Sequence, residues 1–195
     1  MNIQIPKTII KDPRLGANDF LMIVWLKRWM FLWGEVMKVS VSEIKGKMNV
    51  ADTRTIKKIF EKLNKFEIVE WFQIRKFYVE LKVNKDKMNE QPYAQLPVKV
   101  LEKAKVIGSA GVRLLYYYEC HINRDEKKDF CYASVRTIVK ETGLADKTIK
   151  AYNNVLEKEK LLKVVRHGFE EEYNEMDEVT VNRYNNHYYV LVDNI

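Results

Sequence analysis

Apolar side chains recur along this chain at two different spacings, and the order of these spacings predicts its elements. Residues 17–33 are apolar around most of a helical circumference, which predicts a long helix that is covered on several sides. Residues 41–48 and 53–65 carry apolar side chains three and four positions apart, as amphipathic helices do. Residues 68–74 and 77–83 alternate or run apolar, which is typical of strands. The pattern predicts a long helix, two shorter helices and a two-stranded hairpin.

Residues that favour helix ends mark the two shorter helices. Ser40, which follows a short strand at 36–39, forms with Glu43 a capping box for the first of them. Asn49-Val50 provides the turn, and Asp52 is expected to accept backbone N–H groups at the start of the second helix. Two capped helices joined by a tight turn are the sequence signature of a helix-turn-helix.

The same arrangement occurs a second time about 93 residues later. Matching positions are Ser40 and Ser134, Ile44 and Ile138, Ala51-Asp52 and Ala145-Asp146, Thr55-Ile56-Lys57 and Thr148-Ile149-Lys150, and Leu63 and Leu156, with one residue fewer in the second copy. Ile3-Gln4-Ile5-Pro6 and Ala94-Gln95-Leu96-Pro97 extend the likeness to a short first strand of each copy. A repeat of this length indicates one small domain duplicated, because the units of a solenoid are roughly 20–50 residues long.

The second copy is expected to contain the same elements at its own positions. In chain order these are a long helix at 109–121, a short strand at 130–133, a helix capped by Ser134, a turn at Gly143-Leu144, a helix at 147–160 capped by Asp146, and hairpin strands at 161–166 and 187–192. The polar segment 84–91 lacks periodicity and is the expected boundary. The predicted fold is therefore mainly α with small β wings (α+β), as two tandem winged helix-turn-helix domains at 1–88 and 92–195 related by internal duplication.

Length and composition allow each half to bury a core of its own, with 195 residues of which 47% are hydrophobic. The longest apolar run, Phe20 to Leu26, covers seven residues, whereas a membrane-spanning helix needs about 20. The first residues lack the pattern of a signal peptide, so no membrane association and a cytoplasmic location are expected. Cys120 and Cys131 are then expected to be reduced.

Charge is distributed unevenly between the halves. Residues 1–89 contain 18 Lys and Arg against 10 Asp and Glu, a net charge of +8, and residues 90–195 contain 16 against 17, a net charge of −1. A basic domain attracts phosphates and releases their counterions, so the first half has the charge of a polyanion-binding protein. A basic surface that serves solubility is the alternative.

Polar side chains on the outer face of the second helix of each pair are the candidate DNA contacts. They are Thr53, Arg54, Lys57, Lys58 and Lys62 in the first copy, Arg75 and Lys76 at the turn of its hairpin, and Lys147, Thr148, Lys150 and Asn154 in the second copy. Arginine can hold guanine and asparagine can hold adenine through two hydrogen bonds each, while lysine and threonine can bind phosphate. A solvated helix face with ordinary lysines is the alternative.

The second hairpin is expected to differ from the first, because its long loop is acidic. The acidic residues are Glu170, Glu171, Glu172, Glu175, Asp177 and Glu178. Their charge would repel phosphate, so this wing is not expected to contact DNA. The sequence leaves two interpretations of this loop open, namely that it contacts replication or transfer proteins, or that it is a solvated, mobile loop.

Catalytic and metal-binding patterns are not found in the sequence. His121, His167 and His187 share no metal-ligand spacing with each other or with the cysteines. The segment 108–111 is too short for a phosphate-binding loop. No cofactor is expected, and the protein is not expected to be an enzyme.

With these motifs the chain resembles the tandem winged-helix DNA-binding proteins of low-GC Gram-positive bacteria and their plasmids and phages. The segment SVRTIVKETGLADKTIKAYNNVLEKEKLL is similar to the helix-turn-helix of many such regulators. The opening IPKTIIKDPRLGANDFLMIVWLKRW is similar to the start of plasmid replication initiators of the RepA N-terminal family. The resemblance implies DNA binding in replication initiation, conjugative transfer or transcriptional regulation.

Two functions remain open from the sequence. The first is a protein that binds double-stranded DNA as a monomer, with two recognition helices acting as an internal pseudo-dimer on two half-sites. The second is a protein-interaction adaptor whose winged helices have reduced DNA contact, which the near-neutral second half favours. The basic recognition face of the first copy favours DNA.

Overall fold

The computed structural model describes residues 1–122, 124–126, 128–167, 169–173, 179–183 and 185–195, with the backbone alone at 125, 169–173 and 179–183. The first half contains β1 (Asn2–Pro6), α1 (Lys7–Ile10), α2 (Ala17–Trp33), β2 (Val36–Ser40), α3 (Val41–Met48), α4 (Thr53–Lys65), β3 (Val69–Ile74), β4 (Tyr78–Val83) and α5 (Lys85–Met88). The second half contains β5 (Tyr93–Pro97), α6 (Val100–Glu119), α7 (Val135–Thr142), α8 (Asp146–Lys158), β6 (Leu162–Val165), β7 (Phe169–Tyr173), β8 (Val179–Arg183) and β9 (His187–Val190). The fold is mixed α+β with small antiparallel sheets.

The helix pair α3–α4 forms where the capping residues predict it. The Ser40 hydroxyl accepts a hydrogen bond from the Glu43 backbone N–H at 3.0 Å, and the Asp52 carboxylate accepts one from the Arg54 N–H at 2.8 Å. Between them, Asn49 ends α3 in the left-handed conformation. The amphipathic pattern is confirmed as well, because α4 buries Ile56, Ile59, Phe60 and Leu63.

A three-stranded sheet of order β2-β4-β3 covers this helix pair. Residues directly opposite each other in an antiparallel sheet share a face. The row of Met37, Leu81 and Phe72 therefore points to one side, and it points inward, since the first two are buried and Phe72 stacks on Phe60 of α4 at 5.6 Å. The predicted hairpin 68–74 and 77–83 is confirmed as β3 and β4.

The long helix predicted to begin at Ser109 is confirmed, because α6 is interrupted at Gly108 and continues from Ser109 to Glu119; a helical segment at 100–107, which was not predicted, precedes it. Apolar Val100, Leu101, Ala104 and Ile107 follow helical spacing and are buried, which makes 100–107 helical as well. Gly108 then interrupts the helix with φ +67°, a value that glycine adopts without a Cβ penalty.

Three predictions for the second half were wrong. The strand expected at 130–133 is a single bridge between Cys131 and Tyr188, because the chain turns at Ser134 to cap α7. The cap of α8 is Ala145, with Asp146 already inside the helix, because the one-residue deletion in this copy falls between the aspartate and Ile149. The expected long loop contains the paired strands β7 and β8, consistent with Phe, Tyr, Val and Thr in those segments.

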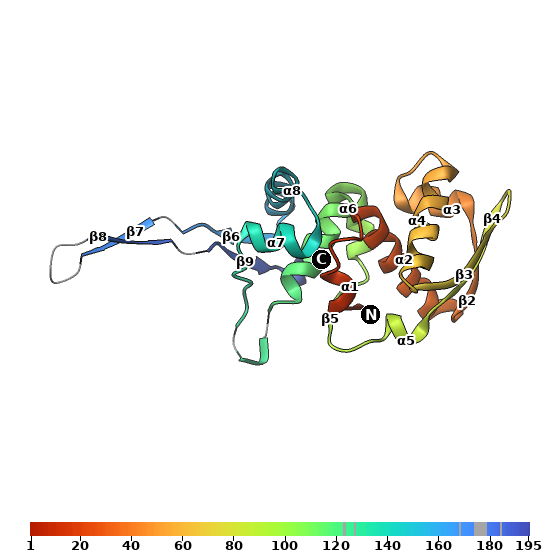
Figure 1. The fold of residues 1–195 in the computed structure, drawn as a ribbon, viewed down its shortest axis with the longest axis horizontal. Helices are drawn as coiled ribbons and strands as arrows, with labels where there is room; N and C mark the ends of the chain where they lie inside the picture. The colour runs from red at the N-terminus through yellow and green to blue at the C-terminus, as the bar shows by residue number, and fades with distance from the viewer. Residues whose placement is uncertain (123, 127, 168, 174–178, 184) are drawn as a thin grey trace.

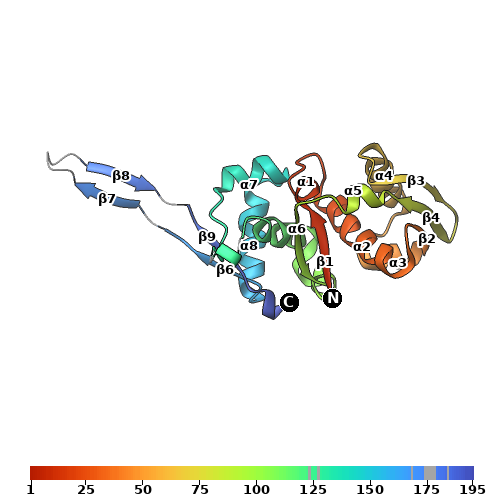
Figure 2. The same ribbon diagram turned by 90° about the horizontal axis from the view of Figure 1, so that it is seen from below.

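The acidic cluster is divided by this hairpin. Glu170, Glu171 and Glu172 belong to β7, opposite Asn182, Val181 and Thr180 of β8. Glu175, Asp177 and Glu178 lie outside the described residues. In Figures 1 and 2 the two strands extend away from the helices at one end of the molecule.

The polar segment 84–91, expected to be a linker without periodicity, contains the short helix α5. The Asn84 side chain accepts a hydrogen bond from the Lys87 N–H at 3.0 Å, which caps the helix, and Met88 is buried. Asparagine is among the strongest N-capping residues, so the cap explains the difference from the prediction.

The two halves are joined through their first strands, which pair with each other. In this antiparallel pair Gln4 lies opposite Gln95, Ile3 opposite Leu96 and Ile5 opposite Ala94. A local two-fold rotation that exchanges the two strands therefore places Ile3 on Ala94 and Ile5 on Leu96, which are matching positions of the sequence repeat. The long helices α2 and α6 pack together beside this strand pair, and they lie between α3–α4 and α7–α8 in both views (Figures 1 and 2).

A second junction connects the loop before α2 to the second half. Arg113 of α6 is fully buried and donates hydrogen bonds to the carbonyl groups of Leu15 and, at 2.7 Å, Asp12. Gly143, in the turn between α7 and α8, lies so close to this loop that a Cβ would come within 2.2 Å of the Pro13 carbonyl oxygen. The turn between α7 and α8 thus lies directly against the first half, while α8 itself packs on α6.

Among the described residues, none of the helices is both long enough and apolar enough to cross a membrane. In the same part of the chain no group of three or more His, Cys, Asp or Glu side chains is placed to hold a metal ion. Cys120 and Cys131 are free and buried, and burial raises the pKa of both thiols, to about 12 and about 11.

Lys27 of α2 gives a pH-dependent prediction. Its ammonium donates to the Met88 carbonyl and to Asn89 Oδ1, each at 2.5 Å, and burial lowers its pKa to about 8. Between about pH 8 and the ordinary lysine value of about 10.4, the unfolded chain binds more protons than the folded one, so this residue's contribution to the free energy of unfolding rises with pH. Urea unfolding of wild type and Lys27→Met is measured at pH 7.5 and 9.5. The free energy of unfolding of wild type should rise relative to that of the variant at the higher pH. A difference independent of pH would contradict the lowered pKa.

Candidate nucleic-acid interface

The outer face of α4 carries an exposed cluster of cations. Arg54, Lys57 and Lys58 are exposed, and Thr53 at the start of the helix is partly exposed. Lys57 lies 3.7 Å from Glu61, a solvent-exposed pair that contributes about 0–1 kcal/mol and that a phosphate can replace. Four of the five residues predicted on this helix therefore face solvent together.

Lys62 lies elsewhere on the helix. Its ammonium is 2.6 Å from Asp19 of α2, whose carboxylate also accepts a hydrogen bond from the Gly16 N–H at 2.7 Å. Lys62 is about one-third exposed, and Asp19 is buried. This lysine joins α4 to the start of α2 and is not part of the outer cluster.

The turn of the first hairpin is basic and aromatic. Its backbone is closed by a hydrogen bond from the Arg75 N–H to the Tyr78 carbonyl at 2.8 Å, and the Arg75 guanidinium donates to Gln73 Oε1 at 2.8 Å. The Lys76 ammonium is 5.1 Å from the centre of the Phe77 ring, which is 69% exposed. Both predicted residues are thus exposed at the tip of this hairpin.

The matching face of α8 is more polar and less positive. Lys147, Lys150 and Asn154 are exposed and Thr148 is partly exposed. Lys150 forms an ion pair at 2.9 Å with Asp146, one turn earlier on the same helix. The uncompensated charge on this face is therefore smaller than on α4.

A groove between α7, α8 and the base of the second hairpin was not predicted from the sequence. Two cavities of about 240 and 380 Å³ share Val135, Asn186 and Tyr188 among their lining residues. Their other lining residues are Ser134, Arg136, Lys150, Asn153, Asn154, Val164, Arg166, His167 and Asn185. The polar groups of the groove are mainly amides and cations.

Two side chains of this groove show how it is built. Arg166 is held by Glu157 of α8 at 2.6 Å, and this contact raises the pKa of its guanidinium. Asn153 is buried, and its Oδ1 accepts a hydrogen bond from Tyr118 of α6 at 2.7 Å. Tyr152 and Val155 of α8 are partly buried against the core, and polar Asn153 is more fully buried than either.

The sequence contained weak signals for these groove residues. Arg136 is in the first turn of α7, and Asn185-Asn186 comes directly before β9. Amides and arginines at helix starts and strand ends are common on protein surfaces, so the sequence does not indicate that these residues lie together. The tertiary structure brings them together by placing the base of the second hairpin beside α7 and α8. The predicted residues themselves form two faces, one on α4 with the hairpin turn and one on α8.

Comparison with known proteins adds no relative to this description. A scan against protein-family models finds no match, and a search of curated proteins finds no significant match.

Proposed function

We propose that this protein binds double-stranded DNA with sequence selectivity, through two winged helix-turn-helix domains at 1–88 and 92–195 that arose by duplication. The exposed basic face of α4 is the observation that carries the proposal, since Arg54, Lys57 and Lys58 project together from the second helix of a capped helix pair. Such a face combines phosphate binding with a group that can read guanine in the major groove.

The repeat supports two recognition helices in one chain. The shared residues of the two copies and the two-fold register of β1 and β5 are consistent with a pseudo-dimer built into a monomer. The α8 face and the groove beside it offer amides and arginines, which suit base edges and phosphates. In this proposal the second half contributes register and selectivity, and the first half supplies most of the affinity.

The biological setting follows from the resemblance to plasmid and phage regulators. We place the protein in the cytoplasm, in replication initiation, conjugative transfer or transcriptional regulation of a mobile element, without catalytic activity or a cofactor. A contact of the acidic hairpin with replication or transfer proteins belongs to the same proposal.

The test is a selection of duplexes from a random pool by the whole chain, followed by titration of a selected duplex and a random one at several salt concentrations. Enrichment of two short half-sites is expected, with log K falling linearly against log salt in proportion to the phosphates contacted. No enriched sequence, together with equal binding of both duplexes, would contradict selective recognition. No binding to either duplex at low salt would contradict DNA binding altogether.

A protein-interaction adaptor is the second candidate function. It is favoured by apolar residues at the end of α2 and the start of β2, where Phe31 is 71% exposed and Trp33 49% exposed. Exposed apolar residues in one segment are typical of protein-binding surfaces. Selective duplex binding in the experiment above would decide against it as the main function.

A further inference from the structure

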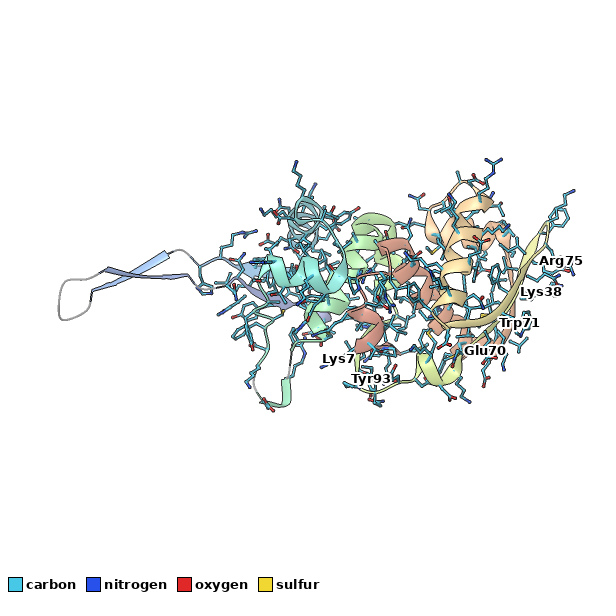
Figure 3. All side chains as sticks on the ribbon, viewed as in Figure 1. Lys7, Lys38, Glu70, Trp71, Arg75 and Tyr93 are labelled. Carbon is cyan, nitrogen blue, oxygen red and sulfur yellow. The ribbon has the colours of Figure 1, made fainter. Side chains whose placement is uncertain are left out.

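The outer side of the β2-β4-β3 sheet carries an ordered set of polar and aromatic residues that duplex binding by α4 and α8 does not use. We call the outer sheet face the residues Lys38, Trp71, Gln73, Tyr78, Glu80 and Lys82. The register places Trp71 opposite Lys82, and Gln73 and Lys38 on either side of Glu80. Figure 3 shows Lys38, Trp71 and Arg75 on the side of this sheet that faces away from the helices.

Flat aromatic surface is available on this face and beside it. Trp71 is 44% exposed although it lies within a strand, because its neighbour Phe72 occupies the inward position against α4. Tyr78 is partly exposed, and Phe77 at the adjoining turn is largely exposed. The aromatic rings thus follow the hairpin from its base at Trp71 to its tip.

Cations lie between these rings. The Lys38 ammonium is 3.6 Å from the centre of the Tyr78 ring and 3.6 Å from Glu80, and Lys82 is 2.7 Å from Glu70. Both pairs are partly exposed to solvent, which screens the attraction between their charges. Because such solvent-screened pairs are weak, each lysine ammonium can turn from its glutamate to a phosphate group of an anionic chain.

We propose that the outer sheet face binds single-stranded DNA. Sequence-tolerant single-strand binding combines aromatic rings, on which unpaired bases stack, with cations that follow the backbone, and this face has both within one net-positive half. A protein partner is less suited to it, because the centres of protein interfaces are depleted in lysine and glutamate, which here separate the rings. The inference goes beyond duplex recognition and uses a different surface.

The experiment measures binding of the whole chain to labelled oligo(dT) of about 12 nucleotides and, separately, to duplex DNA. Trp71→Ala should weaken oligo(dT) binding at least about tenfold and leave duplex binding within about twofold, while Trp71→Phe should retain most single-strand affinity because it keeps an aromatic ring. Trp33→Ala, which removes a similarly exposed tryptophan from the end of α2, should leave oligo(dT) binding unchanged. Arg54→Ala with Lys57→Ala and Lys58→Ala should weaken duplex binding and spare oligo(dT).

Several results would overturn the inference. Unchanged oligo(dT) binding by Trp71→Ala would remove this face as the site, and tighter binding of oligo(rU) than of oligo(dT) would overturn the assignment to DNA. A change in the solution mass of Trp71→Ala, with oligo(dT) binding unaltered, would identify a protein interface instead. If Trp71→Ala unfolds, Lys38→Glu provides the same test, because a reversed charge on this face should also weaken oligo(dT) binding about tenfold.

Discussion

Replacing Arg54, Lys57 and Lys58 together by alanine is expected to weaken binding of a selected duplex about 100-fold at moderate salt. Each bidentate contact of arginine with a base contributes about 1–3 kcal/mol, and each lysine–phosphate contact releases counterions. The slope of log K against log salt should therefore become less steep by about 2 when the two lysines are lost. Fluorescence anisotropy over a range of salt concentrations measures both quantities.

A matched control removes the same number of charges from other elements. Lys85, Lys99 and Lys105 are exposed in α5, before α6 and within α6, so their joint replacement lowers the net charge equally without changing α4. Only a small loss of affinity is expected from this variant. If both triple variants lost affinity to the same extent, net charge and not the α4 face would explain binding, and the recognition helix would have to be sought elsewhere.

The second large effect is expected from Gly143→Ala, at the junction of the two halves. Gly143 has φ +68°, where side chains are strained, and its Cβ would come within 2.2 Å of the Pro13 carbonyl oxygen. Backbone must move to relieve such a contact, so a loss of about 2–3 kcal/mol in the free energy of unfolding is expected. For a chain of this size that loss lowers Tm by roughly 5–10 °C, measured by circular dichroism.

Gly46→Ala is the control for this prediction. Gly46 lies in the middle of α3, and nothing lies within 4 Å of a Cβ placed there. Alanine should stabilise this helix by about 0.5–1 kcal/mol, so the two glycine variants should differ in sign. Equal melting temperatures for Gly143→Ala and wild type would show that the turn and the loop can separate at no cost. Equal melting temperatures would also show that the turn between α7 and α8 is not held tightly against the loop before α2.

The junction between the halves also affects how the protein can be divided for experiments. β1 has β5 as its strand partner, and Arg113 of the second half bonds the loop before α2. Fragments cut within 89–92 would each lose these contacts. Variants of the whole chain are therefore the appropriate means of assigning DNA contacts to one half or the other.

The local elements of the first half were determined by its sequence. Caps at Ser40 and Asp52 and the apolar spacing of α4 act within a few residues, so no distant contact is needed to place α3, α4 and the hairpin. The same local rules identified the outward residues Arg54, Lys57 and Lys58, because side chains opposite a buried stripe face solvent. Where two such signals lay one residue apart, as at Ala145 and Asp146, sequence matching alone chose the wrong cap.

Only the tertiary structure decided how these elements meet. Lys62 lies on the same helix as Lys58, yet it forms an ion pair with Asp19, which is more than forty positions earlier in the chain. This pair forms because α2 passes beside that side of α4. The pairing of Gln4 with Gln95, the groove of Arg136 and Arg166, and the burial of Asn153 against Tyr118 likewise join residues that are far apart in sequence. Hydrophobic periodicity reports which face of an element is buried and not what buries it, so these contacts depend on how the two halves pack together.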